Sequence, residues 1–180
     1  MTIALRTGNE FDLAAVGRLH YRSRAASHVD LVPPEASTFG SEEALGVWWA
    51  ERFRWERDTH RLTVADDGER IVGFTYLGPA EPNPAEEPGV VELYAIHVEP
   101  SFVGTGVGRA LMVDAIPHLG ERPVLWVLDR NSRARRFYAQ GGWFPDGVTR
   151  RAPMGAVTTH QVRYSLTRAA ASGGREHATE

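Results

Sequence analysis

The feature that most constrains the fold of this chain is an apolar run that leads directly into a glycine-rich turn. Val90–Val98 is nearly continuous in apolar residues, which is the pattern of a strand buried on both faces. Three glycines at alternate positions follow, at Gly104, Gly106 and Gly108, and the next apolar residues recur at the spacing of a helix. The sequence therefore predicts a buried strand, a tight turn and a helix in direct succession.

The segments on either side of this turn predict a mixed α/β fold. Asn9, Ser41 and Asn131 are typical N-cap residues, each followed by a helical pattern. Pro117 is expected to end or kink the helix after the turn, and Gly141-Gly142 to end the last helix. The resulting order is β-α-α-β-β-β-α-β-α-β-β, a central mixed but mostly antiparallel sheet flanked by helices. Strands are expected at 3–6, 61–65, 70–77, 90–98 and 124–128, from Trp143, and around Val162, Tyr164 and Leu166.

A single domain accounts for nearly the whole chain of 180 residues. We expect the folded domain to span residues 1–168 and residues 169–180 to form a flexible C-terminal tail. The segments 28–40 and 78–89 are interrupted by Pro and Gly and are expected to be loops. Trp48, Trp49 and Trp55 lie in the second predicted helix and are expected to be mostly core residues.

The composition excludes several classes of chemistry. The chain has no Cys, which rules out disulfides, thiolate metal sites and a cysteine nucleophile, and no Lys, which rules out a Schiff base. Its net charge of −3 gives no reason to expect a nucleic acid or an anionic membrane as partner. The first residues do not resemble a signal peptide, and no apolar run reaches the ~18 residues of a membrane-spanning helix. We therefore expect a cytoplasmic protein without a nucleic acid, a membrane or a metal as partner.

The glycine turn has the properties of a phosphate-binding loop. Glycines let consecutive backbone N–H groups converge on an anion, and the following helix adds the positive end of its dipole. A Walker A loop is excluded because it requires a lysine. A dinucleotide-binding turn does not match, because Arg109 occupies the position of its third glycine. Two interpretations stay open at this point: a pyrophosphate cradle to which Arg109 adds a charge, and a tight turn with a purely structural role.

Two separated motifs resemble the signature of the GCN5-related N-acetyltransferase (GNAT) family. The first runs from Glu92 to Met112 and contains Val103-x-x-Gly106-x-Gly108, where the family pattern is Gln/Arg-x-x-Gly-x-Gly/Ala. The second, from Asn131 to Trp143, resembles the family stretch Asn-x-x-Ala-x-x-Phe-Tyr-x-x-x-Gly-Phe. Together the two motifs cover the central third of the chain in the family's order. Val103 departs from the pattern, so a side-chain contact to the cofactor is absent there.

The resemblance implies an acetyltransferase-like domain that binds acetyl-CoA as a cosubstrate and needs no metal. Backbone N–H groups near Ile96 and Val98 are implied to bind the pantetheine arm, and one of them to face the thioester oxygen. Asn131 is implied to contact the cofactor or ordered water in addition to capping its helix. The implied cofactor-binding residues are Ile96, His97, Val98, Val103, Gly104, Thr105, Gly106, Val107, Gly108, Arg109, Asn131, Arg135 and Tyr138.

The resemblance also implies that the acetyl group is transferred directly to a primary amine of a small molecule or peptide, without an acyl-enzyme. Glu92 is the implied general base, since a carboxyl group in an apolar setting has a raised pKa. Tyr138 is the implied general acid for the departing thiolate. His97 is an alternative base, and strict alternation along the strand places it on the opposite face from Glu92.

The acceptor and the oligomeric state stay open. The acceptor pocket is expected between the 28–40 loop, the second helix and the 78–89 loop, whose acids Glu81, Glu86 and Glu87 either attract a cationic amine or are simply solvated. A non-catalytic CoA-binding or regulatory module on the same fold is the alternative function. Since members of the family often dimerise, a homodimer is the implied assembly.

Overall fold

The fold is built on one seven-stranded sheet within the residues that the computed structural model describes, 2–28, 31–32, 40–81, 89–154 and 157–166. The strand order is β1-β2-β3-β4-β5-β7-β6, and of these neighbours β4 and β5 run parallel while the other pairs are antiparallel. The predicted fold class and order of elements are confirmed. The strands are β1 (Ala4–Thr7), β2 (Arg61–Asp66), β3 (Ile71–Pro79), β4 (Val90–Val98), β5 (Arg122–Leu128), β6 (Trp143–Met154) and β7 (Val157–Leu166), and the helices are α1 (Leu13–His28), α2 (Glu42–Glu56), α3 (Val107–Ala115) and α4 (Ser132–Gln140).

The helices begin and end near the predicted residues, because capping hydrogen bonds and a proline act locally. The Asn9 side chain accepts a bond from the N–H of Phe11 at 2.9 Å, and the N–H of Asn9 donates to Asp12 at 2.9 Å, which forms a capping box ahead of α1. Ser41 accepts a bond from the N–H of Ala44 at 3.2 Å at the start of α2. Pro117 lies in a short 3-10 turn directly after α3, so that helix ends where the proline predicts.

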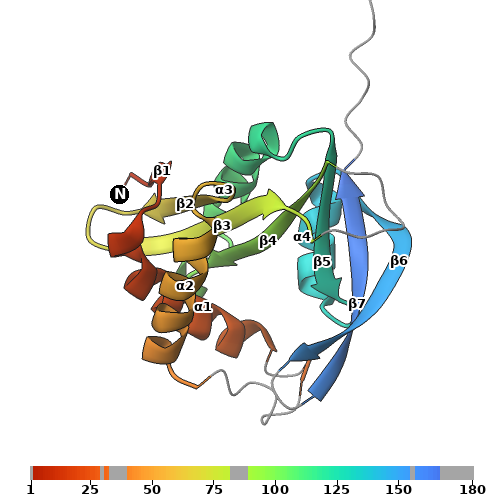
Figure 1. Cartoon of the computed structure of the whole chain (residues 1–180), viewed down its shortest axis with the longest axis horizontal. Helices are drawn as coiled ribbons and strands as arrows, with labels where there is room; N and C mark the ends of the chain where they lie inside the picture. Colours follow the sequence, from red (N-terminus) through yellow and green to blue (C-terminus); the bar gives the residue numbers. More distant parts are fainter. Residues whose placement is uncertain (1, 29–30, 33–39, 82–88, 155–156, 167–180) are drawn as a thin grey trace, which may run out of the picture.

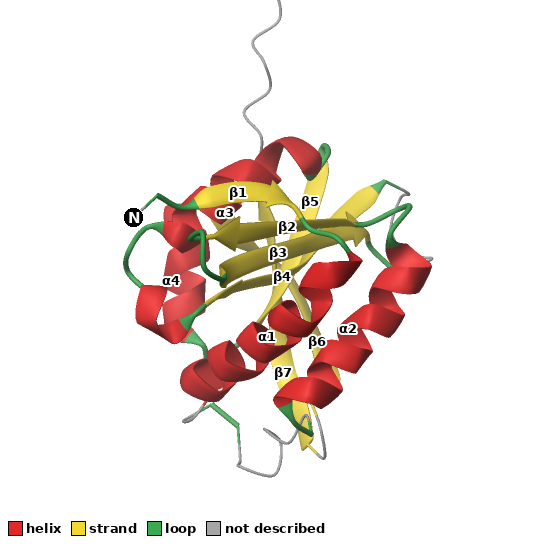
Figure 2. Ribbon diagram, turned by 90° about the vertical axis from the view of Figure 1, so that its left-hand side faces the viewer, coloured by secondary structure: helices red, strands yellow, loops and turns green. Residues whose placement is uncertain are grey.

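The helices cover both faces of the sheet. Helices α1 and α2 lie side by side across one face, and α3 and α4 lie on the other (Figure 1, Figure 2). One core forms between α1, α2 and the sheet around Leu19, Trp49 and Phe74, and a second forms under α3 and α4 around Met112 and Leu125. None of the described helices combines the length and apolarity needed to cross a bilayer.

The two helices α1 and α2 touch backbone to backbone. A Cβ atom added at Gly17 of α1 would lie 2.3 Å from the backbone N of Gly46 in α2, far inside van der Waals contact. A Cβ added at Gly46 would instead lie 3.4 Å from the nearest atom, the Cα of Ala14. The close crossing therefore depends on the missing side chain of Gly17 alone.

Two of the three tryptophans expected in the core lie at the surface. Trp49 is 1% exposed, but Trp48 is 45% and Trp55 76% exposed. Successive residues of a helix are rotated by 100°, so only the face of α2 that carries Leu45 and Trp49 meets α1 and the sheet. The prediction for Trp48 and Trp55 was wrong because it relied on residue type instead of helical position.

Parts of the predicted loops fall outside the described residues. Of the 28–40 segment, residues 29–30 and 33–39 are not described, and of the 78–89 segment, residues 82–88 are not. The second loop was predicted to begin too early, since Gly78 and Pro79 still belong to β3 and pair with β4. The predicted tail 169–180 also lies outside the described part, so the proposed domain boundary stays a prediction.

The glycine pair at the crossing allows a direct test of this packing. We predict that Gly17→Ala lowers the free energy of unfolding by about 1–3 kcal/mol, because the new Cβ overpacks the contact with Gly46. The matched variant Gly46→Ala should be neutral or raise it by up to about 1 kcal/mol, the usual gain from Gly to Ala in a helix. Urea denaturation of both variants would measure the difference, and equal stability of the two would contradict the assigned crossing.

Candidate active site

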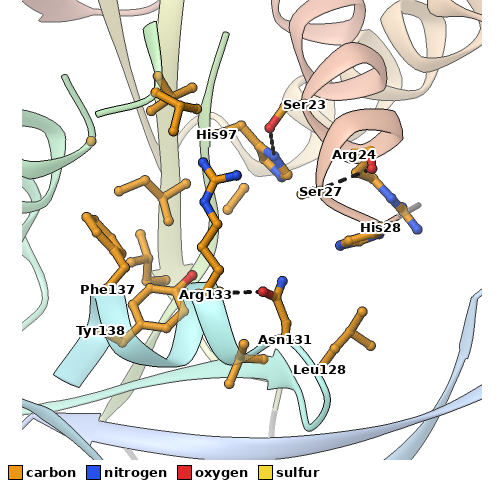
Figure 3. Close-up of a pocket in the computed structure, with 18 of the residues that line it drawn as sticks. Ser23, Arg24, Ser27, His28, His97, Leu128, Asn131, Arg133, Phe137 and Tyr138 are labelled. Carbon is orange, nitrogen blue, oxygen red and sulfur yellow. Dashed lines mark hydrogen bonds between the residues drawn. The ribbon is translucent and has the colours of Figure 1, made fainter. Parts of the chain in front are cut away.

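The site is formed by two parallel strands that separate. Strands β4 and β5 pair over three residues only, Val90–Glu92 with Arg122–Val124. Beyond this point the two strands diverge (Figure 1), because β5 continues along β7 while β4 continues along β3. A cavity of about 710 Å³ occupies the opening. Figure 3 shows its walls: Ser23, Arg24, Ser27 and His28 of α1 face Asn131, Arg133, Phe137 and Tyr138 at α4.

The unpaired edge of β4 presents backbone donors to this opening. The N–H of Glu99 donates to the carbonyl oxygen of Val72 at 2.9 Å, so it points toward β3. Successive N–H groups of a strand point in opposite directions, and those of Ile96 and Val98 therefore point away from β3 into the opening. This direction agrees with the predicted binding of a pantetheine arm by these two residues.

A β-bulge at Tyr94 changes which side chains share a face. Tyr76 pairs with Ala95 and its neighbour Leu77 with Leu93, so Tyr94 is an extra residue in β4. As a result Leu93 and Ile96, three positions apart, both pack in the core under α3 and α4. Glu92 and His97 then lie together on the other face. The expectation that they lie on opposite faces was wrong, because it assumed unbroken alternation.

The glycine turn is an open cradle of backbone N–H groups. Gly104 and Gly106 have φ angles of 84° and 95°, the left-handed region that favours glycine, and a Cβ added at either would meet no atom within 4 Å. Within the described part of the chain, the N–H groups of Gly104, Gly106, Gly108 and Arg109 donate to no backbone carbonyl. These donors, together with the N-terminus of α3, fit a pyrophosphate.

Val103 contributes less to the cradle than the sequence suggests. Its N–H donates to the carbonyl oxygen of Pro100 at 3.3 Å, so it is already used within the turn. The N–H of Thr105 is used in the same way, by Phe102 at 3.2 Å. The Val103 side chain lines the cavity and is 45% exposed, without a polar group to offer.

A comparison with protein families identifies this arrangement. The model of the acetyltransferase (GNAT) family matches residues 29–143, which include the opening, the glycine turn and α4. The chain belongs to the GNAT family of acetyltransferases. The resemblance predicted from the two motifs is confirmed, and so is the assignment of the chain as an acyltransferase.

Proteins named as acetyltransferases resemble this chain over most of its length. A Mycobacterium tuberculosis protein named a probable N-acetyltransferase is 26% identical over 173 residues, which cover 95% of this chain and 97% of that protein. The mycothiol acetyltransferase of Geodermatophilus obscurus is 31% identical over 117 residues, 60% of this chain but 38% of that protein. The solved structure of the PaiA N-acetyltransferase from Thermoplasma acidophilum in complex with coenzyme A has a TM-score of 0.74 at 14% identity and covers 93% of this chain and 100% of that one, which shows a shared fold.

Most of the residues predicted to bind the cofactor line the cavity, and three do not. Val107 is 4% exposed and packs in the core, and Thr105 is absent from the walls. Arg135 points elsewhere: its Nε donates to the Tyr164 hydroxyl at 3.0 Å and its Nη1 to Asp129 at 2.9 Å. The structure therefore does not support a cofactor contact by Arg135. Its neighbours Arg133 and Arg136, which the sequence analysis missed, line the cavity instead, together with the predicted Ile96, His97, Val98, Val103, Gly104, Gly106, Gly108, Arg109, Asn131 and Tyr138.

Glu92 is a buried carboxyl group beside the cavity. It is 8% exposed, and burial raises its pKa to about 7 despite the opposing effects of Arg150 and Arg52, with Glu81 adding to the rise. The Glu92 side chain does not line the main cavity, whereas that of Tyr94, two residues along β4, does.

Tyr94 also borders a second cavity of about 420 Å³. The walls of this cavity are Tyr94, Trp48, Glu51, Arg52, Trp55, Glu56 and Glu81. Helix α2 and Glu81 therefore border this second cavity, while Glu86, Glu87 and most of the 28–40 loop, also expected at an acceptor pocket, lie outside the described residues.

Tyr138 has the properties that a general acid needs. It lines the main cavity, and among the described residues no side chain or backbone group is hydrogen bonded to its hydroxyl. Burial raises the pKa of Tyr138 above its ordinary value, so the phenol keeps its proton at neutral pH.

Helix α1 supplies a polar wall that the sequence analysis did not assign to the site. His20, Ser23, Arg24, Ser27 and His28 all line the cavity, and their spacing of three and four residues, a visible signal in the sequence, places them on one helical face. The ring of His97 lies 4.4 Å from that of His20, and the Ser23 hydroxyl is 3.1 Å from His97 Nδ1.

The histidines of this wall are uncharged at neutral pH. Trp49 Nε1, which can only donate, lies 3.0 Å from His20 Nδ1, so the proton of neutral His20 is on Nε2. Burial lowers the pKa of His20 to about 3 and that of His28 to about 4, and it lowers the pKa of His97 well below 6.5. A histidine this difficult to protonate is a weak proton acceptor, which favours Glu92 over His97 as the base.

The raised pKa of Glu92 predicts the pH dependence of the reaction. A general base must be ionised, so kcat/KM should rise with pH and reach half its maximum near pH 7. Glu92→Gln should lower kcat by about 10²–10⁴-fold and remove this dependence. Glu81→Gln should keep the dependence and move it to lower pH, because Glu81 raises the pKa of Glu92. Steady-state rates between pH 5.5 and 9 would measure this; the same dependence in Glu92→Gln would exclude Glu92 as its origin.

Proposed function

We propose that the protein transfers the acetyl group of acetyl-CoA directly to a primary amine of a small molecule or peptide. The observation that carries the proposal is the arrangement around the opening between β4 and β5. An open amide cradle and a protonated tyrosine line this opening, and a buried carboxyl group with a pKa near neutrality lies beside it. These are the groups that acyl transfer to an amine needs.

The residues of the opening fit acetyl-CoA. The free N–H groups of the glycine turn would hold the pyrophosphate, and Arg109 in the first turn of α3 would add a charge. The N–H groups of Ile96 and Val98 would bind the pantetheine arm along the unpaired edge of β4. Acetyl-CoA supplies a thioester carbonyl carbon and a thiolate leaving group.

Each proton of the reaction has a group in this chain to move it. The amine nitrogen forms a bond to the carbonyl carbon, and Glu92 accepts the proton that the nitrogen loses, directly or through water. The carbon–sulfur bond breaks, and Tyr138 donates its proton to the departing sulfur. Exchange with solvent then restores both residues. The step requires no acyl-enzyme, in keeping with a chain that has no cysteine.

A non-catalytic CoA-binding module is not favoured by these observations. Such a module has no use for a buried carboxyl group next to the cofactor opening, because burying it costs stability at neutral pH. The two functions differ in a simple measurement, the release of free CoA in the presence of amines.

The role of Tyr138 can be separated from cofactor binding. We predict that Tyr138→Phe lowers kcat by about 10²-fold, the lower end of the range for general acid catalysis, while the thermal stabilisation by acetyl-CoA is unchanged. Acetyl-CoA should stabilise the wild-type protein, and ATP or NAD should not. Unchanged turnover in both Tyr138→Phe and Glu92→Gln would exclude the assigned catalytic groups.

The side chain at position 103 should set part of the cofactor affinity. Val103 lines the cavity at the edge of the glycine turn. We predict that Val103→Gln lowers the Kd for acetyl-CoA by about 3- to 10-fold, the effect of one added hydrogen bond. Val113→Gln is the control, because Val113 is a 60% exposed residue of α3 away from the cavity. Calorimetric titration would measure both, and equal affinities would contradict the contact.

A further inference from the structure

An arginine is held over the face of a tryptophan beside the active site. The Cζ of Arg150 in β6 lies 4.1 Å from the ring centroid of Trp126 in β5, and its Nε donates to Gln161 Oε1 at 2.7 Å. Strand pairing brings these residues together, since Arg150 pairs with Gln161 and Gln161 with Leu128. Trp126 and Gln161 both line the main cavity. The guanidinium is therefore fixed next to the cavity by a ring and an amide.

Among the described residues, Arg150 has no carboxylate or imidazole partner, unlike the nearby Arg163 and Arg151. Arg163 binds Asp146 at 2.7 Å, and Arg151 binds His160 at 3.1 Å. Among the described residues no carboxylate lies within 4 Å of Arg150, and its Nε bond to Gln161 leaves the terminal nitrogens without an acceptor. Arg150 is also exposed to solvent. Its planar pair of donors is suited to a carboxylate.

The proposed base lies within electrostatic reach of this arginine. Arg150 is the charged group with the largest effect on Glu92, and Glu92 in turn acts on Arg150, together with Glu81 and Tyr94. The two side chains do not form an ion pair at 4 Å or less. The carboxyl group and the guanidinium therefore act on each other without direct contact.

The charges of the main cavity agree with an acidic group on the acceptor. Its described wall contains four arginines, Arg24, Arg109, Arg133 and Arg136, and no Asp or Glu. The cofactor phosphates would use Arg109 at the glycine turn. Beyond the groups that would hold the cofactor phosphates, this described wall has no carboxylate to pair with a second cation on the acceptor.

We infer that the acceptor is a primary amine that also carries a carboxylate, as in a free amino acid. Arg150, held by Trp126 and Gln161, binds the carboxylate, and this orients the amine toward Glu92. The inference rests on the proposed function, because it assigns the substrate class of the same site. The acidic and aromatic second cavity next to Tyr94 would instead suit an amine without a carboxylate, which is the competing outcome.

Matched pairs of amines test this inference. Each pair has the same side chain with and without the carboxylate: L-phenylalanine and 2-phenylethylamine, L-methionine and 3-(methylthio)propylamine, L-lysine and cadaverine. Acetyl transfer is followed by release of CoA, and binding of each amine in the presence of CoA is followed by calorimetry. We expect the carboxylated member to have the higher kcat/KM and the tighter binding in at least one pair.

Substitution of Arg150 should remove that preference. In Arg150→Gln the ratio of kcat/KM between the carboxylated and decarboxylated members should fall by about 10- to 100-fold, the value of a bidentate charged contact. Arg151→Gln, next in sequence and bound to His160, should keep the wild-type ratio, and both variants should keep the wild-type Kd for acetyl-CoA.

The outcomes separate the two proposals. A preference for the decarboxylated member in all three pairs, or an equal loss for both members in Arg150→Gln, would overturn the assignment of Arg150. If no amine is acetylated but calorimetry still shows tighter, Arg150-dependent binding of the carboxylated members, the substrate class stands and the proposed reaction fails. If neither binding nor transfer distinguishes the members of any pair, the inference is wrong.

Discussion

The structure of the active site depends on how briefly β4 and β5 pair. Parallel neighbours usually continue side by side, but here the pairing ends after Glu92 and Val124, and each strand then follows a different antiparallel partner. The separation leaves the N–H groups of Ile96 and Val98 without a partner strand. It also allows one face of α1 to line the cavity. A buried N–H group without an acceptor is unfavourable, so this edge is a template for an extended ligand with its own carbonyl groups. The geometry proposed to bind the cofactor is thus a property of the backbone more than of any side chain.

The same opening separates two chemical environments. At the glycine turn, N–H groups and Arg109 provide positive potential for phosphates. Away from the turn, the histidines of α1 and His97 are neutral, which supports the proposed assignment of the acid–base chemistry to Glu92 and Tyr138, whose pKa values are both raised by burial. Burial thereby brings the pKa of the Glu92 carboxyl group near neutrality and keeps the Tyr138 phenol protonated. The first group is suited to accept a proton and the second to donate one.

Local sequence signals were sufficient for the fold and for the position of the glycine turn. The caps at Asn9, Ser41 and Asn131 and the glycines of the turn act through their own backbone, so their effect is visible in a few residues. The family resemblance added the cofactor.

Features that arise from tertiary contacts were not visible in this way. The bulge at Tyr94 depends on the register with β3, and it reversed the predicted relation of Glu92 and His97. The direction in which the Arg135 side chain points depends on Tyr164 from a distant strand.

The bulge also makes the arrangement of side chains along β4 depend on the number of residues in the strand. Loss of one residue between Leu93 and Ile96 would restore regular alternation and turn one end of the strand over, so that a carboxyl group would face the apolar core under α3. The number of residues between Glu92 and His97 therefore matters to the site as much as the identity of their side chains.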